Sequence, residues 1–181
     1  PYRETLKILD RYQVQGERVF AYGGSDAHGI RIKLPLIGIE IGSYEQGFRS
    51  INMHILTEQP RQNSLDHDRK LIYQALAKGN SWVSCDYYLN SRGFRFEAQS
   101  PQGRWGMGST IPWHRGIDLY VKTPYPARVS MLRNGRPWAT SQGDKHRFSV
   151  NRSGVYRVEA EHRRGWSWQP WIFSNPIWII E

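Results

Sequence analysis

Residues 22–29 read Tyr22-Gly23-Gly24-Ser25-Asp26-Ala27-His28-Gly29, directly after the apolar run Arg18-Val19-Phe20-Ala21. The apolar run predicts a buried strand over 18–22, and the glycines let the backbone turn at its end without a Cβ penalty. Asp26 and His28 stand two residues apart, so an extended backbone would point both side chains to one face. Carboxylate and imidazole are ligands that suit Zn, Mn or Fe. A second interpretation stays open: a glycine-rich turn with an Asx cap and an exposed histidine.

The residues before this stretch predict a helix over 1–15. Its apolar face contains Leu6, Leu9 and Tyr12, and Gly16 is placed to end it. A helix, a short turn, a strand and a ligand-bearing loop together form the αβ half of a βα unit. In barrels built of such units, active-site residues lie on the loops that follow the strands.

Residues 30–57 follow with a weaker pattern. Glycine and proline interrupt 30–47, which predicts a loop with one short strand. Residues 51–57 read as a strand with Ile51, Met53 and Ile55 on one face. His54 lies on the opposite face, and we interpret it as an ordinary solvent-facing or hydrogen-bonded histidine.

A helix is predicted over 65–78, with Ser64 as its N-cap and Gly79 after its end. Adjacent helical residues diverge by about 100°. His67 and Asp68 are therefore interpreted as solvated first-turn residues rather than as a pair of metal ligands.

After Trp82 the sequence changes to short segments rich in β-branched and aromatic residues. Asn134-Gly135 between two apolar runs predicts a type I′ hairpin. Six or seven short strands without a helical period predict an antiparallel β-sandwich over 86–181, separated near residue 85 from a first domain over 1–85. The predicted strands are 81–85, 94–99, 117–122, 128–133, 145–150, 154–161 and 171 to the end, with turns at 100–103, 133–136, 141–144 and 151–154.

The composition excludes some classes of protein. The chain has 25 Lys and Arg against 16 Asp and Glu, a formal charge of +9, but the basic residues form no block of the kind found in nucleic-acid-binding tails. We expect neither a membrane-spanning segment nor a signal peptide, so the chain is predicted to be soluble, with its localisation open. The single cysteine, Cys85, is interpreted as a small buried hydrophobe. The start at Pro1, without Met, suggests a product trimmed from something longer.

Tryptophan-rich residues 165–171, Gly-Trp-Ser-Trp-Gln-Pro-Trp, follow Arg163 and Arg164. They are consistent with a stacking surface for sugars or bases, or with side chains that fill the sandwich core. Trp105, Trp113 and Trp138 are further candidates for a binding surface.

Together these residues resemble a known family. Gly24-Ser25-Asp26-Ala27-His28 is followed by residues 70–84, Lys-Leu-Ile-Tyr-Gln-Ala-Leu-Ala-Lys-Gly-Asn-Ser-Trp-Val-Ser, by the turn 133–135, Arg-Asn-Gly, and by residues 171–177, Trp-Ile-Phe-Ser-Asn-Pro-Ile. In order and spacing this resembles the C-terminal part of a PHP (polymerase and histidinol phosphatase) domain, more narrowly of the CehA/McbA-like metallohydrolases. The resemblance covers about residues 16 to 180.

The resemblance implies an α+β chain: the C-terminal βα portion of a distorted (β/α)7 barrel, followed by the antiparallel β-sandwich. It implies a cluster of divalent metals (Zn, Mn or Fe) in the complete protein, with Asp26 and His28 matching the family's last metal-binding pair. It also implies hydrolysis of small anionic or ester substrates, either phosphate esters or carboxyl and carbamate esters, by a metal-bound hydroxide.

The chain departs from the family because it contains no H-x-H pair, which precedes this region in such proteins. Two ligands are too few for a catalytic site, so the expectation is a fragment that is inactive alone and holds no metal by itself. It would associate with the missing N-terminal part, and neither catalytic nor substrate-binding residues are assigned. The alternative is a β-sandwich binding module that presents tryptophans to a carbohydrate or protein partner; nucleic acid and membrane partners are not expected.

Overall fold

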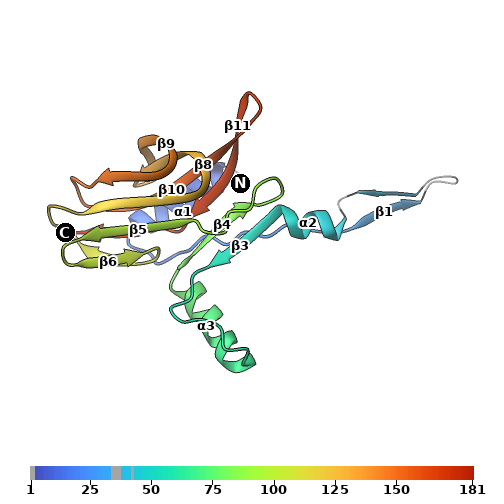
Figure 1. Ribbon diagram of the computed structural model, residues 1–181, viewed down its shortest axis with the longest axis horizontal. Coiled ribbons are helices and arrows are strands. Elements are labelled where there is room, and N and C mark those ends of the chain that lie inside the picture. The colour runs from blue at the N-terminus through green and yellow to red at the C-terminus, as the bar shows by residue number, and fades with distance from the viewer. Residues whose placement is uncertain (1–2, 34–37, 42) are drawn as a thin grey trace.

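A computed structural model describes residues 3–33, 38–41 and 43–181, in which one ten-stranded sheet dominates the chain (Figure 1). The path through this sheet is β3-β4-β11-β10-β8-β5-β6, with β9 beside β8 and β12 between β10 and β7. All pairings are antiparallel except that of β7 with β12. The helices are α1 (Arg3–Val14), α2 (Tyr44–Ser50) and α3 (Leu65–Ala77). The strands are β1 (Ile30–Lys33), β2 (Gly38–Ile41), β3 (Ile51–Ile55), β4 (Ser81–Cys85), β5 (Arg95–Ser100), β6 (Gly103–Gly106), β7 (Thr110–Pro112), β8 (Asp118–Arg133), β9 (Arg136–Ser149), β10 (Gly154–Arg164), β11 (Ser167–Ser174) and β12 (Ile177–Ile180).

The core lies within the C-terminal strands, which gives the chain the β-rich, sandwich-like α+β character that its alternating residues predict. Strand β8 is shared by two parts of the sheet, because residues 118–122 pair with β5 and residues 128–133 pair with β10. Between these halves Pro124 and Pro126 cannot donate to the ladder, and the register with β9 shifts there. Alternate side chains of β5, β8 and β10 enter one apolar cluster around Phe96, Leu119 and Val158.

The Asn134-Gly135 hairpin is confirmed. Arg133 pairs with Arg136, and the two residues between them have φ values of +52° and +73°, as a type I′ turn requires. The predicted division of 117–133 into two strands is wrong, since β8 is continuous. The predicted break at 141–144 is wrong as well, because these residues lie inside β9, where Gly143 pairs with Ala127. Cross-strand pairing with β8 outweighs the local turn signal of Ser141-Gln142-Gly143-Asp144.

Helix α1 is confirmed, but its buried face differs from the predicted one. Asp10 and Gln13 face the sheet: Asp10 accepts two hydrogen bonds from Arg157 of β10, at 2.6 and 2.8 Å, and the Gln13 carbonyl accepts one from Trp178 Nε1. Tyr12, predicted in the apolar stripe, is 48% exposed. Leu6 and Leu9 of the predicted face are half-buried, so polar contacts and apolar side chains share the side of this helix that faces the sheet.

The strand predicted over 18–22 does not form. This segment joins no ladder, and Val19 and Tyr22 are exposed. Side chains satisfy its backbone instead: the Ala21 N–H donates to Asn175 Oδ1 at 2.7 Å. The ring of Phe20 packs edge-on against Trp178 of β12 at 5.9 Å. The segment thus crosses the sheet as a connector.

Residues 30–50 contain more structure than the predicted loop with one short strand. Strands β1 and β2 pair as a hairpin, Ile30 with Ile41 and Lys33 with Gly38, and α2 follows. Residues 34–37 and 42, within the region predicted as loop, lie outside the described residues. In Figure 1 this hairpin extends away from the ten-stranded sheet.

Strand β3 and helix α3 confirm the predicted elements, and Ser64 occupies the N-cap position as predicted, although its side chain makes no cap hydrogen bond. One interpretation is corrected. Asp68 is buried rather than solvated, and its carboxylate accepts hydrogen bonds from the Gln62 N–H and from Arg61. Both bonds lower the pKa of Asp68, the one from Gln62 most strongly. Figure 1 shows α3 standing away from the sheet.

The ten-stranded sheet contains strands from both sides of residue 85, where a domain boundary is predicted. Strand β4 pairs with β3 before it and, through Trp82 to Ser84, with β11 near the C-terminus. The division into residues 1–85 and 86–181 stays a prediction. Cys85 is half-buried and its thiol is free. Among the described residues, no helix combines the length and apolarity needed to cross a membrane.

Candidate functional site

The loop over 22–29 is held against β3, β4 and α2. The Gly23 N–H donates to Met53 Sδ at 3.3 Å, and a Cβ on Gly23 would lie 2.4 Å from Val83 Cγ1. A Cβ on Gly47 of α2 would lie 2.5 Å from the Cβ of Ala27. Glycines at both positions therefore allow the loop to approach the sheet edge and the helix closely.

Asp26 and His28 lie side by side on this loop, although not for the predicted reason. Asp26 has a φ of +49°, a left-handed conformation, instead of the extended backbone that would align positions i and i+2. The Asp26 carbonyl oxygen lies 2.7 Å from His28 Nδ1, and the Asp26 carboxylate lies 3.7 Å from the same nitrogen. The side chains are 93% and 67% exposed, respectively. The turn thus orients the imidazole through Nδ1, and Nε2 takes part in neither contact with Asp26.

Asp26 and His28 are suitable metal ligands, but two ligands are too few to form a site. Carboxylate and imidazole are appropriate ligands for Zn, Mn or Fe. Within 3–33, 38–41 and 43–181, however, no group of three His, Cys, Asp or Glu side chains could hold an ion. Catalytic zinc takes three protein ligands. Asp26 and His28 therefore fit a metal as part of a larger ligand set, and the pair alone does not make a site.

A second polar cluster is built around Asp86, directly after β4. Its carboxylate lies 2.6 Å from His54 Nε2 and accepts hydrogen bonds from Ser84 Oγ at 2.6 Å and from the Ser91 N–H at 3.0 Å. The His54 ring stacks on Trp82 with centroids 4.8 Å apart and planes within 7°. Burial alone would raise the pKa of Asp86, but the hydrogen bonds from His54, Ser84 and Ser91 outweigh it and lower the pKa to about 2.

The two clusters lie on opposite faces of the β3–β4 pair. His54 and its cross-strand neighbour Trp82 point to one face, whereas Met53 and Val83, which contact the loop, point to the other. His54 is thus hydrogen-bonded, in agreement with its interpretation as an ordinary histidine, and it does not join Asp26 and His28. Asp86 was not predicted from the sequence, because only the β3–β4 register, with Ile51 opposite Cys85, brings it beside His54.

The tryptophans divide between core and surface. Trp171 is fully buried and its Nε1 donates to the Leu89 carbonyl at 2.7 Å. Trp168 lies under Arg128, whose Cζ is 4.9 Å from the ring centroid. Trp166, at the turn between β10 and β11, is 98% exposed. Trp105, Trp113 and Trp138 pack against the core.

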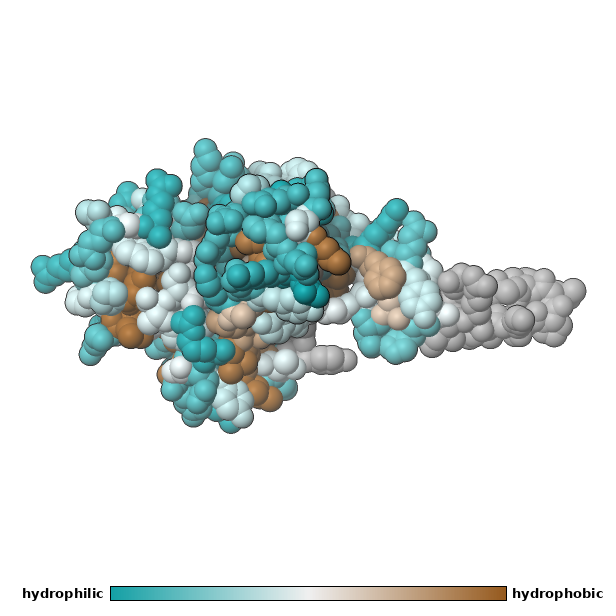
Figure 2. Space-filling view, turned by 90° about the horizontal axis from the view of Figure 1, so that it is seen from below, coloured by the Kyte–Doolittle hydropathy of each residue, from teal (hydrophilic) through white to brown (hydrophobic). Residues whose placement is uncertain are grey.

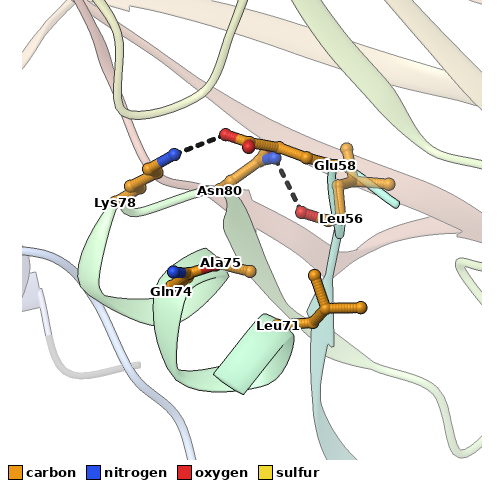
Figure 3. Close-up of a pocket in the computed structure, with 7 residues that line it drawn as sticks. All are labelled: Leu56, Glu58, Leu71, Gln74, Ala75, Lys78 and Asn80. Carbon is orange, nitrogen blue, oxygen red and sulfur yellow. Dashed lines mark hydrogen bonds and ion pairs between the residues drawn. The ribbon is translucent and has the colours of Figure 1, made fainter. Parts of the chain in front are cut away.

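Two hollows border α3. Figure 3 shows a hollow between α3 and the end of β3, of about 10 Å³, which is room for about one water molecule. Within it Lys78 contacts Glu58, and Asn80 donates to the Leu56 carbonyl at 2.7 Å. A wider, open depression follows the outer side of α3, lined in part by Leu65, Ile72 and Tyr73.

Comparison of the chain with protein-family models, with curated proteins and with solved structures gives no match.

Proposed function

We propose that this chain is the C-terminal part of a metal-dependent hydrolase of the PHP type. Asp26 and His28 would supply two ligands of its metal cluster, and the other ligands would come from polypeptide outside this sequence. The substrates would be small anionic or ester compounds, either phosphate esters or carboxyl and carbamate esters.

The observation that carries this proposal is the uneven exposure of apolar side chains. Among the described residues, fifteen large apolar side chains are exposed, and twelve of these lie between residues 8 and 88. They include Tyr44 and Phe48 of α2 and Leu65 and Tyr73 of α3. Figure 2, which views the molecule from the end at which α3 stands out, shows hydrophobic surface among the polar residues on this side. An exposed apolar patch that is contiguous often marks a site of contact with a partner.

The exposed surface adjoins the candidate ligands. Tyr44 lies against Gly29, where an added Cβ would come within 2.6 Å of its ring, and it stacks on Phe48 at 5.9 Å. A polypeptide that covers α2 would therefore also reach Asp26 and His28. This is the arrangement expected if the rest of a barrel packs here and completes the ligand set.

The residues of this chain would then have distinct roles. A bound divalent metal would supply an activated water at neutral pH and would polarise the substrate's oxygen. The backbone carbonyl of Asp26 fixes the His28 ring through Nδ1, which leaves Nε2 as the ligating nitrogen. The Asp26 carboxylate adds a negative charge beside the ring.

The test uses the product of the whole open reading frame. In Asp26→Ala and His28→Ala we expect metal content, measured by elemental analysis, to fall from stoichiometric to residual. Hydrolysis of aryl phosphates and aryl esters should fall at least a hundredfold. Glu17→Ala removes another exposed carboxylate close by in the chain and should change neither quantity. Full metal content in Asp26→Ala would remove Asp26 from the ligand set, and the 181-residue chain alone should bind Zn²⁺ only weakly.

A second candidate function, a binding module for a carbohydrate or a protein, rests on the exposure of Trp166. Its emission should shift when glycans are titrated into the protein. An unchanged spectrum across neutral and acidic glycans would count against the carbohydrate partner.

A further inference from the structure

The turn between β10 and β11 holds Trp166 outside the body of the protein. Arg164 pairs with Ser167, and Gly165 between them has a φ of +58°, as expected for the first central residue of a type II′ turn. Arg163 Nε donates to the Gly165 carbonyl at 3.2 Å, and Ser167 Oγ donates to the Arg164 carbonyl at 3.3 Å. These bonds brace the turn, so the exposure of the indole is a property of an ordered hairpin. We call residues 163–167 the hairpin tip.

The hairpin tip is cationic. Arg163 and Arg164 are exposed, and neither takes part in an ion pair within the described parts of the chain. The nearest acidic residue along β10, Glu161, is engaged by Arg128 at 2.6 Å. Arg164 lies over the ring of Tyr88 with its Cζ 3.8 Å from the centroid, which holds its charge beside the tip. Two guanidinium groups therefore flank one exposed indole, and no carboxylate of the described residues forms an ion pair with either of them.

The surrounding aromatic rings do not form a stacking track. Arg164 covers one face of Tyr88, Tyr87 packs edge-on against Tyr88 at 4.7 Å, and Arg128 covers Trp168. Single-stranded nucleic acids bind along successive free rings in a basic groove. Trp166 is 98% exposed, whereas Tyr88 and Trp168 each have an arginine over the ring. An indole can enter a lipid interface without any groove, because its apolar body and its N–H suit the headgroup region.

We propose that the hairpin tip docks on an anionic lipid surface, with Trp166 in the interface and Arg163 and Arg164 on the lipid phosphates. Charge complementarity with this basic chain, formally +9, favours the contact. The sequence predicts no membrane partner because it contains no spanning segment, but peripheral contact requires none. This inference does not depend on Asp26 and His28.

The test measures co-sedimentation of the chain with vesicles of phosphatidylcholine mixed with phosphatidylglycerol, and the blue shift of tryptophan emission. Trp166→Ala should weaken binding at least tenfold and abolish most of the shift. Arg163→Ala and Arg164→Ala should each weaken it roughly fivefold. Matched controls are Tyr73→Ala, an exposed aromatic on α3, and the double variant Arg136→Ala/Arg152→Ala, at the other end of β10; both should bind like the parent chain.

Three outcomes would overturn the proposal. One is equal binding to vesicles of phosphatidylcholine alone or to those containing phosphatidylglycerol. Another is binding of a single-stranded oligonucleotide, rather than vesicles, that depends on Trp166. The third is protection of Trp166 from acrylamide quenching in the full reading-frame product, which would mean that protein covers the tip. Metal content and hydrolysis should be unchanged in all the tip variants, so this proposal and the hydrolase proposal fail separately.

Discussion

Residues 94–181 and residues 3–88 differ in where their apolar side chains lie. In the C-terminal region, strands provide both sides of their own core, and Phe96, Leu119 and Val129 are almost completely buried. In the N-terminal region, α2 and α3 have one side against β3 or the loop and the other in solvent, with Leu65 81% exposed. A folded sheet can bury its own apolar face, whereas a single helix needs a second surface. The N-terminal region lacks that surface among the described residues.

The largest effect is expected in the core of the C-terminal region. Trp171→Ala removes a fully buried indole and its hydrogen bond to Leu89, so the free energy of unfolding should fall by about 3–5 kcal/mol. Leu65→Ala on α3 should change it by less than about 0.5 kcal/mol. Urea denaturation measures both. A cost above about 1 kcal/mol for Leu65→Ala would contradict the exposure of α3 and weaken the comparison.

The next effect concerns the link between the two regions. Asp10→Ala should destabilise the chain by about 3 kcal/mol, because it leaves the buried guanidinium of Arg157 with only Glu159 as an anionic partner. The loss should be partly recovered in the double variant Asp10→Ala/Arg157→Met, measured by the same denaturation. Glu4→Ala, on the exposed side of α1, is the control. If Asp10→Ala behaves like Glu4→Ala, α1 does not dock on β10 in solution.

A pH dependence is expected from Asp86, which ties β3 to β4 and the following loop. Its folded-state pKa of about 2 lies below the usual 3.8, so its contribution is complete above about pH 4 and is lost as the pH falls toward 2. The contribution at neutral pH is about 2 kcal/mol. Asp86→Asn should remove that part of the acid sensitivity in denaturation series between pH 5 and 2. Asp66→Asn, at an exposed carboxylate, should keep it.

The smallest effect tests the start of α3. Ser64→Ala should cost less than about 0.5 kcal/mol, since the Ser64 side chain accepts no bond from the helix backbone. Asp68→Ala should cost more than Ser64→Ala, because Asp68 binds the Gln62 N–H and Arg61. Helical circular dichroism together with urea denaturation would rank the two variants, and the reverse order would mean that the Ser64 side chain caps the helix in solution.

Much of the fold follows from local pattern. The Asn134-Gly135 turn, α1, α3 and β4 lie where periodicity and turn residues place them, because their residue patterns are local signals. The continuity of β9 depends on cross-strand pairing with β8. The segment 18–22 joins no ladder, and the Ala21 N–H donates instead to Asn175, 154 residues away in the sequence. Local residue types do not reveal such contacts. Gly143 is typical of a turn, and only its pairing with Ala127 shows that it lies inside a strand.

The candidate site shows the same limit. The residue types and spacing of Asp26 and His28 indicate possible ligands, and the structure brings them together through a left-handed Asp26 that spacing alone does not predict. The pairing of His54 with Asp86 joins residues 32 positions apart, and no short motif marks it. The face of β3 on which His54 lies could be predicted from alternation, but its partner Asp86 could not.

The attachment of α1 to β10 has a consequence for biosynthesis. Asp10 is translated 147 residues before Arg157, and Gln13 is translated 165 residues before Trp178. At ribosomal speeds of about 5–20 residues per second, α1 waits on the order of 10–30 seconds for the strands that hold it. During that interval both sides of the helix are accessible to chaperones and other factors that bind nascent chains. One side contains Ile8 and Tyr12, and the other contains Asp10 without its partner Arg157. The helix that leaves the ribosome early is thus among the last elements to be anchored.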